Sequence, residues 1–338
     1  MSNVEDLVTI ANTLVAKEKG ILAADESSPT MKRRFEAVNV EPTEENRRDY
    51  REMLFRTDGI SKFISGIILF DETLRQNGKD GKPLVNVLQE TGIVPGIKVD
   101  KGTKPLAGSN AELVTEGLDG LRERLEEYRD LGARFTKWRA VFSISEKTPS
   151  SYAIDVNAHT LALYAMLSQE AELVPIVEPE VLMDGEHSIE DCFSVTEHVL
   201  REVFSYLGRY GVVLEGCLLK PNMVLSGKSA TSRANPEGVG QQTLTCLKRA
   251  VPAAIPGIVF LSGGQTDDES VANLNAINQL ASDEGAPWQL SFSYGRGLQS
   301  FPLNVWANEP TNIQEAQKAL YTRGHLTSQA RSGQHTPS

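Results

Sequence analysis

The sequence of 338 residues contains few cysteines and histidines, and neither type is grouped as in a metal site. Cys192, Cys217 and Cys246 form no C-x-x-C motif, and the five histidines form no H-x-x-x-H or H-E-x-x-H pair. This spacing argues against a zinc ribbon or a disulfide framework and is typical of reduced thiols in a cytoplasmic protein. We therefore expect no metal site.

Long apolar runs and an excess of positive charge are also absent. No run approaches the roughly 18 residues that a membrane span needs, and residues 1–20 lack the regions of a signal peptide. The net charge of −11 argues against nonspecific binding to nucleic acid or an anionic membrane, because clustered Lys and Arg drive both. The composition predicts a soluble, cytoplasmic protein with neither nucleic-acid nor membrane partners.

Short apolar runs typical of strands recur along the chain and alternate with helical patterns. Capping boxes are expected after Ser188, which begins S-x-x-D, and after Thr266, which begins T-x-x-E. Strands that alternate with helices predict parallel β/α units. The expected strands cover residues 20–25, 64–70, 96–100, 135–142, 173–178, 212–220, 257–262 and 288–294.

Eight such units in one chain predict an α/β fold, a (β/α)8 TIM barrel with additional N- and C-terminal helices. The additional helices are expected over residues 4–18 and from about residue 312. A doubly wound open sheet is the alternative, but no G-x-G-x-x-G follows the first strand. No linker divides the chain, so we expect a single domain over 1–338, with a mobile polar tail at about 327–338.

Ionisable residues recur where the predicted strands end. In a barrel, residues at the carboxyl ends of the strands converge on one site. Each residue also has an ordinary structural role as an alternative to a place in a site. Lys220 could extend into solvent, Lys137 and Arg139 could form salt bridges, Glu178 and Glu180 could be an acidic rim, and Asp25 could cap a helix. These roles explain the residues only one at a time. The residues are Asp25, Lys98, Asp100, Lys137, Arg139, Glu178, Glu180 and Lys220.

Lys220 ends the apolar run "LEGCLLK" and suggests covalent chemistry. A lysine held in an apolar wall beside another cation, here Lys137, has its charged form disfavoured, so a neutral amine becomes available. Such an amine attacks a ketone to form an iminium, which allows the next carbon-carbon bond to break. Glu178 and Asp25 are placed to move the protons.

Glycine-rich turns follow the last two predicted strands. "LSGGQ" covers 261–265 and "SYGRGLQ" covers 293–299, the place where such barrels often bind phosphate through backbone N–H groups. Arg296 adds a charged fork. The two turns together predict a phosphate site.

Many stretches also resemble one family. The chain is similar to class I fructose-1,6-bisphosphate aldolases in family order from about residue 20 to 300. Several of these stretches are long and carry charged residues at fixed positions. They are "GILAADES", "TEENRRDYR", "GIKVDKG", "KPLAGSN", "GLDGLRERLEEY", "KWRAVFSI", "VPIVEPE", "LEGCLLKPNMV", "FLSGGQ", "LNAIN" and "SFSYGRGLQ".

The resemblance implies a homotetramer of barrels that cleaves fructose 1,6-bisphosphate into dihydroxyacetone phosphate and glyceraldehyde 3-phosphate in glycolysis and gluconeogenesis. It implies no metal and no other cofactor. By this resemblance Lys220 forms the Schiff base, Glu178 shuttles the proton for carbinolamine dehydration with Glu180 beside it, and Asp25 takes the C4-hydroxyl proton. Lys137 is then close to the iminium.

The same resemblance implies the contacts to the phosphorylated sugar. Arg139 lines the site, and the residues of the glycine-rich turns hold one phosphate. Ser27, Lys98 and Arg34 belong to the same phosphate-binding set, but the resemblance does not fix which of the two phosphates each one contacts. The implied contacts are Ser27, Arg34, Lys98, Arg139, Ser262, Gly263, Gly295 and Arg296.

Two features of the sequence depart from the resembled pattern. Animal members carry a C-terminal extension that ends in tyrosine and assists proton exchange on the enamine, whereas the last tyrosine here is Tyr321. We therefore expect slower enamine protonation or another proton donor. In addition, Pro29 stands where relatives often have glycine, so the loop after Asp25 should be stiffer.

Three other functions stay open from the sequence. A transaldolase-like Schiff-base enzyme would share the lysine, but the two phosphate motifs favour a bisphosphate. A noncatalytic phosphosugar-binding or scaffold protein would be expected to lose some of Lys220, Glu178, Lys137 and Asp25, yet all four are present. A metal-dependent aldolase is opposed by the missing histidine pairs.

Overall fold

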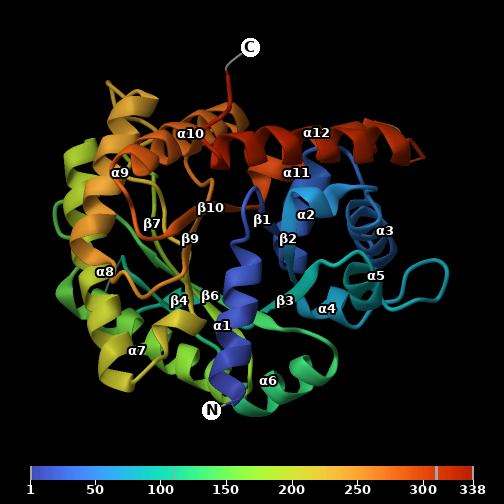
Figure 1. Ribbon diagram of the computed structural model, residues 1–338, viewed down its shortest axis with the longest axis horizontal. Helices are drawn as coiled ribbons and strands as arrows, with labels where there is room; N and C mark the ends of the chain where they lie inside the picture. The colour runs from blue at the N-terminus through green and yellow to red at the C-terminus, as the bar shows by residue number, and fades with distance from the viewer. Residues whose placement is uncertain (1, 110, 309–310, 337–338) are drawn as a thin grey trace.

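A closed barrel of eight parallel strands forms the centre of the computed structural model, which describes residues 2–109, 111–308 and 311–336 (Figure 1). The order around the barrel is β1-β10-β9-β8-β7-β6-β3-β2. This arrangement confirms the predicted TIM barrel and rules out the open doubly wound sheet. The barrel strands are β1 Gly20–Ala24, β2 Ile64–Leu69, β3 Val94–Lys98, β6 Phe135–Phe142, β7 Val174–Val181, β8 Leu218–Leu219, β9 Gly257–Phe260 and β10 Gln289–Tyr294.

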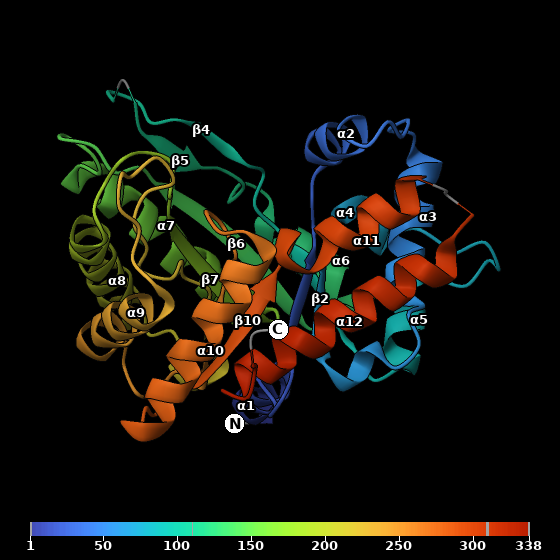
Figure 2. The same ribbon diagram turned by 90° about the horizontal axis from the view of Figure 1, so that it is seen from above.

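Helices surround the barrel, as Figure 2 shows from above. The capping boxes predicted at Ser188 and Thr266 are confirmed, since each side chain accepts the N3 backbone N–H of its helix. The helices are α1 Ser2–Leu14, α2 Ser28–Glu36, α3 Glu44–Phe55, α4 Asp71–Leu74, α5 Leu84–Glu90, α6 Leu121–Asp130, α7 Ser151–Glu170, α8 Ile189–Tyr210, α9 Pro236–Ala250, α10 Asp267–Asp283, α11 Arg296–Asn308 and α12 Ile313–Arg331, with 3-10 turns η1 Ile60–Lys62 and η2 Leu214–Gly216.

The strands are buried on both faces, which is why they read as nearly continuous apolar runs. One apolar cluster fills the space between the barrel and its helices, and a second lies inside the barrel. The barrel is therefore a packed core, and its open end is the place for chemistry.

Helix α1 covers the amino ends of the strands. Its buried residues Leu7, Ala11 and Leu14, together with Val15 directly after it, belong to the same cluster as residues inside the barrel. The approach is close, because a Cβ on Gly257 would lie 2.4 Å from the side chain of Val15. The N-terminal helix thus plugs one end of the barrel and leaves the other end free.

The sixth predicted strand, 212–220, is wrong over most of its length. Only Leu218–Leu219 forms β8, and Leu214–Gly216 forms the 3-10 turn η2. The chain turns where Gly216 meets α1, since a Cβ there would lie 2.9 Å from Leu7 Cβ. Lys220 therefore directly follows a strand of only two residues.

The polar tail predicted from residue 327 also differs from the structure. Helix α12 continues to Arg331, and both Thr327 and Arg331 are buried. The Arg331 guanidinium donates to the carbonyl oxygens of Lys19 and Val15, and Ser328 donates to that of Glu18. Polar side chains here bind backbone carbonyls instead of solvent, which composition alone does not reveal. Residues 337 and 338 of the predicted tail lie outside the described residues.

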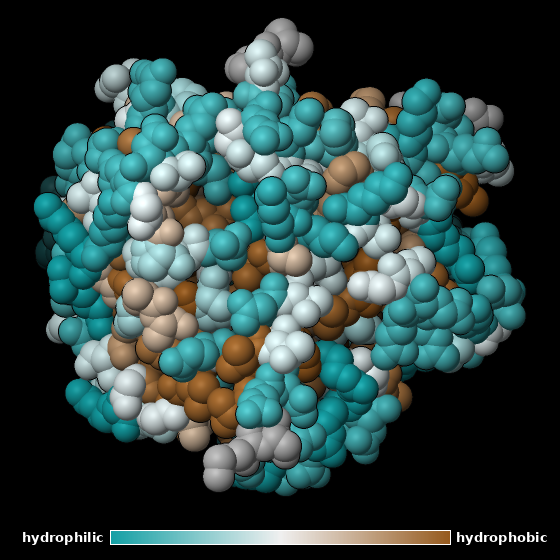
Figure 3. All heavy atoms as spheres, in the orientation of Figure 1, coloured by the Kyte–Doolittle hydropathy of each residue, from teal (hydrophilic) through white to brown (hydrophobic). Residues whose placement is uncertain are grey.

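Two short strands that the sequence pattern did not predict lie outside the barrel. They are β4 Thr103–Pro105 and β5 Leu113–Thr115, which pair antiparallel between β3 and α6. Hydrophilic residues cover most of the face in Figure 3, in keeping with the charged composition. None of the helices in the described part of the chain combines the length and apolar character needed to cross a membrane.

Candidate active site

A cavity of about 240 Å³ lies at the carboxyl ends of the barrel strands. It brings together all the predicted site residues from seven separate strand ends and the helix α2. Parallel strands place their carboxyl ends at one rim, so residues far apart in sequence meet there. The predicted residues in its lining are Asp25, Ser27, Arg34, Lys98, Lys137, Arg139, Glu178, Glu180, Lys220, Ser262, Gly263, Gly295 and Arg296.

Four of these residues form a continuous series of opposite charges. Lys137 Nζ lies 2.6 Å from Asp25 Oδ2 and 3.3 Å from Glu178 Oε2. Lys220 Nζ lies 3.2 Å from the other oxygen of Glu178. The contact of Glu178 Oε2 with Lys137 is an ion pair without hydrogen-bond geometry. The series runs from Asp25 through Lys137 and Glu178 to Lys220.

The elements explain why these four side chains meet. Lys137 lies in β6 and Glu178 in the neighbouring β7, where Arg139 pairs in register with Glu178. The backbone N–H of Lys220 donates to Val177 O, so the lysine starts beside β7 although β8 has ended. The lysine is therefore held at the rim, and its direct ionisable neighbour is Glu178, where the sequence suggested Lys137.

Burial strengthens the interactions within this series. The side chains of Lys137, Glu178 and Lys220 are at most 5% exposed. Burial by itself would raise the pKa of Asp25, but the charges of Lys137 and Lys220 outweigh it and hold that pKa well below its usual range. Asp25 is thus an ionised carboxylate, which is the form that accepts a proton.

The pKa of Lys137 is shifted in the opposite direction to that of Asp25. Burial by itself would lower the pKa of Lys137, but Asp25, Glu178 and Asp100 outweigh it and raise that pKa well above the usual range. Lys137 is therefore a fixed positive charge at neutral pH. Such a charge stabilises negative charge that develops beside it.

Two further ion pairs border the series. Arg139 Nε donates to Glu180 Oε2, and Glu180 thereby outweighs burial and raises the pKa of Arg139 above its usual value. Lys98 Nζ lies 2.7 Å from Asp100 Oδ1. Arg139 thus forms the salt bridge that was its alternative role. Arg139, Glu180 and Lys98 nevertheless line the cavity.

At one side of the cavity the backbone turns after β9 and β10 approach each other. Gly297 N–H donates to Ser262 Oγ over 3.4 Å, and Arg296 starts helix α11. A Cβ on Gly263 would lie 3.0 Å from Glu180 Oε1, so the close approach there favours glycine. A helix start, small residues and an arginine provide donors for a phosphate.

Helix α2 and the residue before it contribute further polar groups to the cavity. Ser27 is its N-cap residue, so the alternative role of Asp25 as the helix cap does not apply. Ser27 Oγ donates to Thr30 Oγ1 over 3.3 Å, and Arg34 donates to Glu26 Oε1. These hydroxyls and the guanidinium line the cavity together.

The structure adds polar residues that the sequence reasoning did not assign. Glu26, the residue after Asp25, lines the cavity. Ser293 also lines it, and its buried hydroxyl has no hydrogen-bond partner among the described residues. Its place two residues before Gly295, with the period of a strand, was the available signal.

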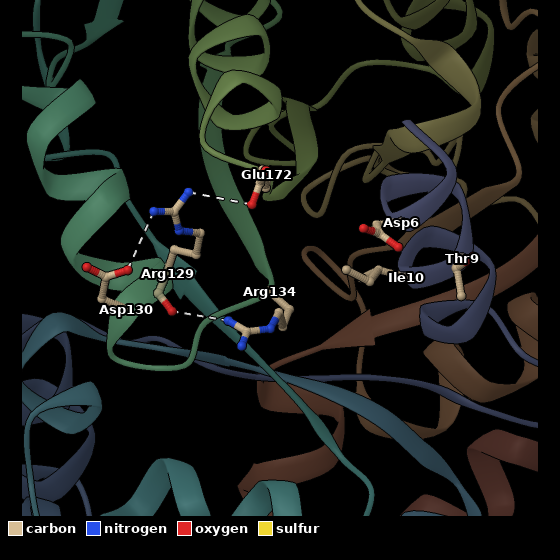
Figure 4. Close-up of a pocket in the computed structure, with 7 residues that line it drawn as sticks. All are labelled: Asp6, Thr9, Ile10, Arg129, Asp130, Arg134 and Glu172. Atoms are coloured by element: carbon tan, nitrogen blue, oxygen red, sulfur yellow. Dashed lines mark hydrogen bonds and ion pairs between the residues drawn. The ribbon is translucent and has the colours of Figure 1, made fainter. Parts of the chain in front are cut away.

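A second cavity, of about 480 Å³, lies at the opposite end of the barrel, between α1, α6 and the starts of β6 and β7 (Figure 4). There Arg129 pairs with Asp130 and Glu172, and Arg134 donates to Arg129 O. Asp6, Thr9 and Ile10 of α1 face them across the gap. No lysine lines this cavity, so it lacks the amine chemistry of the first.

The side chains of the described residues also bear on metal binding. Among residues 2–109, 111–308 and 311–336, no group of three or more His, Cys, Asp or Glu is placed to hold a metal ion. Cys192, Cys217 and Cys246 are free and buried. Burial raises the pKa of the Cys192 thiol to about 11, which makes it a poor nucleophile.

Comparison with protein families and known proteins points in one direction. The family model "fructose-bisphosphate aldolase class-I" matches residues 6–338. A protein of Xanthomonas campestris described as "probable fructose-bisphosphate aldolase class 1" is 56% identical over 322 residues, which cover 95% of this chain and 96% of that protein. The "fructose-bisphosphate aldolase 4, cytosolic" of Arabidopsis thaliana is 52% identical, with 97% of this chain and 83% of that protein covered.

A solved structure agrees in fold over the whole chain. It is fructose-bisphosphate aldolase of Plasmodium falciparum in complex with TRAP and a small-molecule inhibitor. The TM-score is 0.98 at 48% sequence identity, with 100% of this chain and 97% of that chain covered.

Proposed function

This chain belongs to the family of class-I fructose-bisphosphate aldolases, and we propose that it reversibly cleaves fructose 1,6-bisphosphate through a Schiff base on Lys220. The products are dihydroxyacetone phosphate and glyceraldehyde 3-phosphate. The observation that carries the proposal is the contact between a buried lysine, Lys220, and a buried carboxylate, Glu178, in the wall of the cavity. An amine with a proton acceptor at 3.2 Å can become the neutral nucleophile that attacks a ketone.

The first step forms the covalent intermediate. The neutral Lys220 amine adds to the C2 carbonyl of the open-chain sugar, and a carbinolamine results. Glu178, whose Oε1 faces Lys220, gives a proton to the departing hydroxyl group, and water leaves. The product is a protonated imine between Lys220 and C2, and Lys137 lies on the far side of the same carboxylate.

The second step breaks the bond between C3 and C4. Asp25, held ionised by Lys137, takes the proton of the C4 hydroxyl, and C4 becomes an aldehyde carbon. The electron pair of the C3–C4 bond moves to C3 and into the iminium, which gives an enamine. Proton addition at C3 and hydrolysis of the imine then release the ketone product and free Lys220.

Basic and small residues at both ends of the cavity support a substrate with two phosphates. Ser262, Gly263 and Arg296 follow β9 and β10, whereas Lys98 and Arg139 come from β3 and β6 across the barrel. Charge-assisted hydrogen bonds from arginine are roughly twice as strong as neutral ones. A bisphosphate is thus gripped at each end with its ketone near Lys220.

The cellular setting belongs to the same proposal. Two relatives from Arabidopsis thaliana, 52% and 50% identical, carry the word "cytosolic" in their names. We propose the same location for this chain, with a role in glycolysis and gluconeogenesis. A homotetramer is the proposed assembly, which size-exclusion chromatography with light scattering tests directly.

Trapping the imine tests the central claim. Borohydride in the presence of dihydroxyacetone phosphate adds hydride to the imine carbon and leaves a stable secondary amine, which peptide mass analysis locates. We expect the adduct on Lys220 and none in Lys220→Arg, whose guanidinium forms no imine. An adduct on Lys137 or on any other lysine overturns the proposal.

A further inference from the structure

Gln299 connects helix α11 to the segment that follows β1 at the rim of the cavity. It lies in α11, three residues after Arg296, and is 1% exposed. Its Nε2 donates to Ala23 O over 2.6 Å and to Glu26 Oε1 over 2.9 Å. One amide from the helix that starts at the phosphate turn thus reaches the end of β1.

The acceptor Glu26 in turn holds an arginine of the cavity. Its Oε1 also accepts a hydrogen bond from Arg34 Nη1, and its backbone oxygen accepts one from Arg51 Nη2 over 2.6 Å. The Glu26 side chain is 7% exposed and that of Arg34 is 23% exposed. The carboxylate is therefore buried and fixed, and the arginine extends from it toward the cavity.

Helices α2, α3 and α11 pack against one another through aromatic side chains. Phe35 of α2 lies with its ring centroid 5.8 Å from that of Trp306 in α11, and Tyr50 of α3 lies 5.3 Å from Trp306. Figure 2 shows α2, α3 and α11 on the same side of the barrel. The network thus rests on a packed aromatic support.

The chemistry of Gln299 indicates what it is for. Its Oε1 is buried and has no hydrogen-bond partner among the described residues. A buried acceptor without a partner costs stability, so packing alone does not favour an amide over an apolar side chain here. Both donor bonds go to the segment that carries Asp25 and Glu26.

We propose that Gln299 is a positioning residue for Arg34, acting through Glu26, and that it thereby fixes the guanidinium that grips a phosphate of the substrate. An arginine already held in place loses less rotamer freedom when it binds an anion. The same bond ties helix α11, which begins with Arg296, to the carboxylate that holds Arg34. This inference rests on the proposed function for the identity of the phosphorylated substrate.

The test removes the donor while keeping the volume. Gln299→Met has no N–H to give, and Gln299→Glu places a second carboxylate against Glu26. We expect the KM for fructose 1,6-bisphosphate to rise roughly 3- to 10-fold in Gln299→Met and further in Gln299→Glu. We expect kcat to change less than about 2-fold, because Lys220 and Glu178 are untouched.

Combining Gln299→Met with Arg34→Ala separates a positioning role of Gln299 from a purely structural one. If Gln299 acts through Arg34, Gln299→Met has no further effect on KM in Arg34→Ala. Gln317→Met is the matched control, since Gln317 Nε2 also donates to a backbone oxygen, that of Met53, and neither residue lines the cavity. A KM change in the control equal to that of Gln299→Met overturns the proposal, as does an effect of Gln299→Met that persists in Arg34→Ala.

A binding measurement keeps this test independent of turnover. Calorimetry with inorganic phosphate on the same four proteins (wild type, Gln299→Met, Arg34→Ala and the double variant) is expected to show the same pattern in Kd. Equal Kd values for wild type and Gln299→Met overturn the inference. Failure of the proposed function shows differently, as a wild type that neither cleaves the bisphosphate nor forms an adduct on Lys220.

Discussion

Glu178 lies between Lys220 and Lys137, with Oε1 3.2 Å from one ammonium nitrogen and Oε2 3.3 Å from the other. A single buried carboxylate therefore faces two buried cations. Each oxygen serves a different lysine, so the carboxylate can exchange a proton with Lys220 while it stays fixed by Lys137. The amide of a glutamine offers only one acceptor atom and cannot serve both.

Replacing this carboxylate should reduce turnover far more than binding. In Glu178→Gln we expect kcat to fall about 10²- to 10⁴-fold, the range for loss of a positioned acid or base. The KM should change little, because the phosphate contacts remain. Steady-state kinetics measure both. Glu180→Gln is the comparison variant, because Glu180 contacts Arg139 and neither lysine. A larger loss of kcat in Glu180→Gln than in Glu178→Gln contradicts the assignment.

The ion pair of Asp25 with Lys137 should show in the pH dependence of stability. The folded pKa of Asp25 is lowered from 3.8, so its ionised form stabilises the fold fully above that pH and progressively less as pH falls toward the folded value. Asp25→Asn should therefore cost about 3 kcal/mol at pH 7. The difference from wild type should stay constant from pH 6 to 8 and shrink below about pH 3.8.

Urea unfolding of wild type and Asp25→Asn across this range is the measurement. The same variant should lose cleavage about 10²-fold or more at pH 7, since an amide cannot take the C4-hydroxyl proton. A stability difference that grows as the pH falls would contradict the lowered pKa of Asp25.

Arg296 should contribute binding energy and little else. A charge-assisted hydrogen bond to phosphate contributes about 1.5–3 kcal/mol, and 1.4 kcal/mol corresponds to a factor of ten. Arg296→Ala is therefore expected to raise KM about 10- to 100-fold for fructose 1,6-bisphosphate. Arg201→Ala is the control, because Arg201 is exposed on α8 and pairs with Glu197. An unchanged KM in Arg296→Ala would remove the arginine from the phosphate site.

Chelation should leave cleavage intact. In the proposed reaction an iminium on Lys220 withdraws the electrons, so no metal ion is needed for that task. Dialysis against excess EDTA should change kcat by less than about 2-fold, against the complete loss expected of an enzyme that depends on a bound metal. Loss of activity that zinc restores would favour the metal-dependent alternative.

The plug formed by α1 should support the fold without affecting substrate binding. Leu14 is fully buried inside the barrel cluster, so Leu14→Ala is expected to cost about 2–5 kcal/mol of unfolding free energy. Val4→Ala on the same helix should stay within about 0.5 kcal/mol, because Val4 is 42% exposed. Denaturant titration compares the two. Equal losses in both variants would mean that α1 does not plug the barrel.

The local sequence pattern was sufficient for the order of elements and for the residues at the rim. Eight apolar runs separated by helices specify parallel β/α units, because each run needs two covered faces, and eight units without a G-x-G-x-x-G after the first strand favour a barrel over an open sheet. The residues that end these runs then share one rim whatever the details of packing. Lys220, Glu178 and Asp25 could be predicted to meet for that reason.

Local pattern was insufficient where contacts between distant segments set the structure. The shortness of β8 follows from the close approach of α1 to Gly216, and the burial of Arg331 follows from carbonyls near residue 19. Neither contact leaves a periodic signal in its own segment. The periods of strands and helices describe one segment at a time, whereas contacts with a distant segment decide where β8 and α12 end.

The sequence by itself therefore determined the barrel, the amine and the acids available to it. Tertiary structure alone decided which acid meets which base. Closure of the barrel placed Glu178 between two lysines, and it brought Gln299 within 2.9 Å of Glu26, a residue 273 positions earlier. Such distances depend on how the strands close and the helices pack, since side chains that are remote along the chain carry no common local pattern.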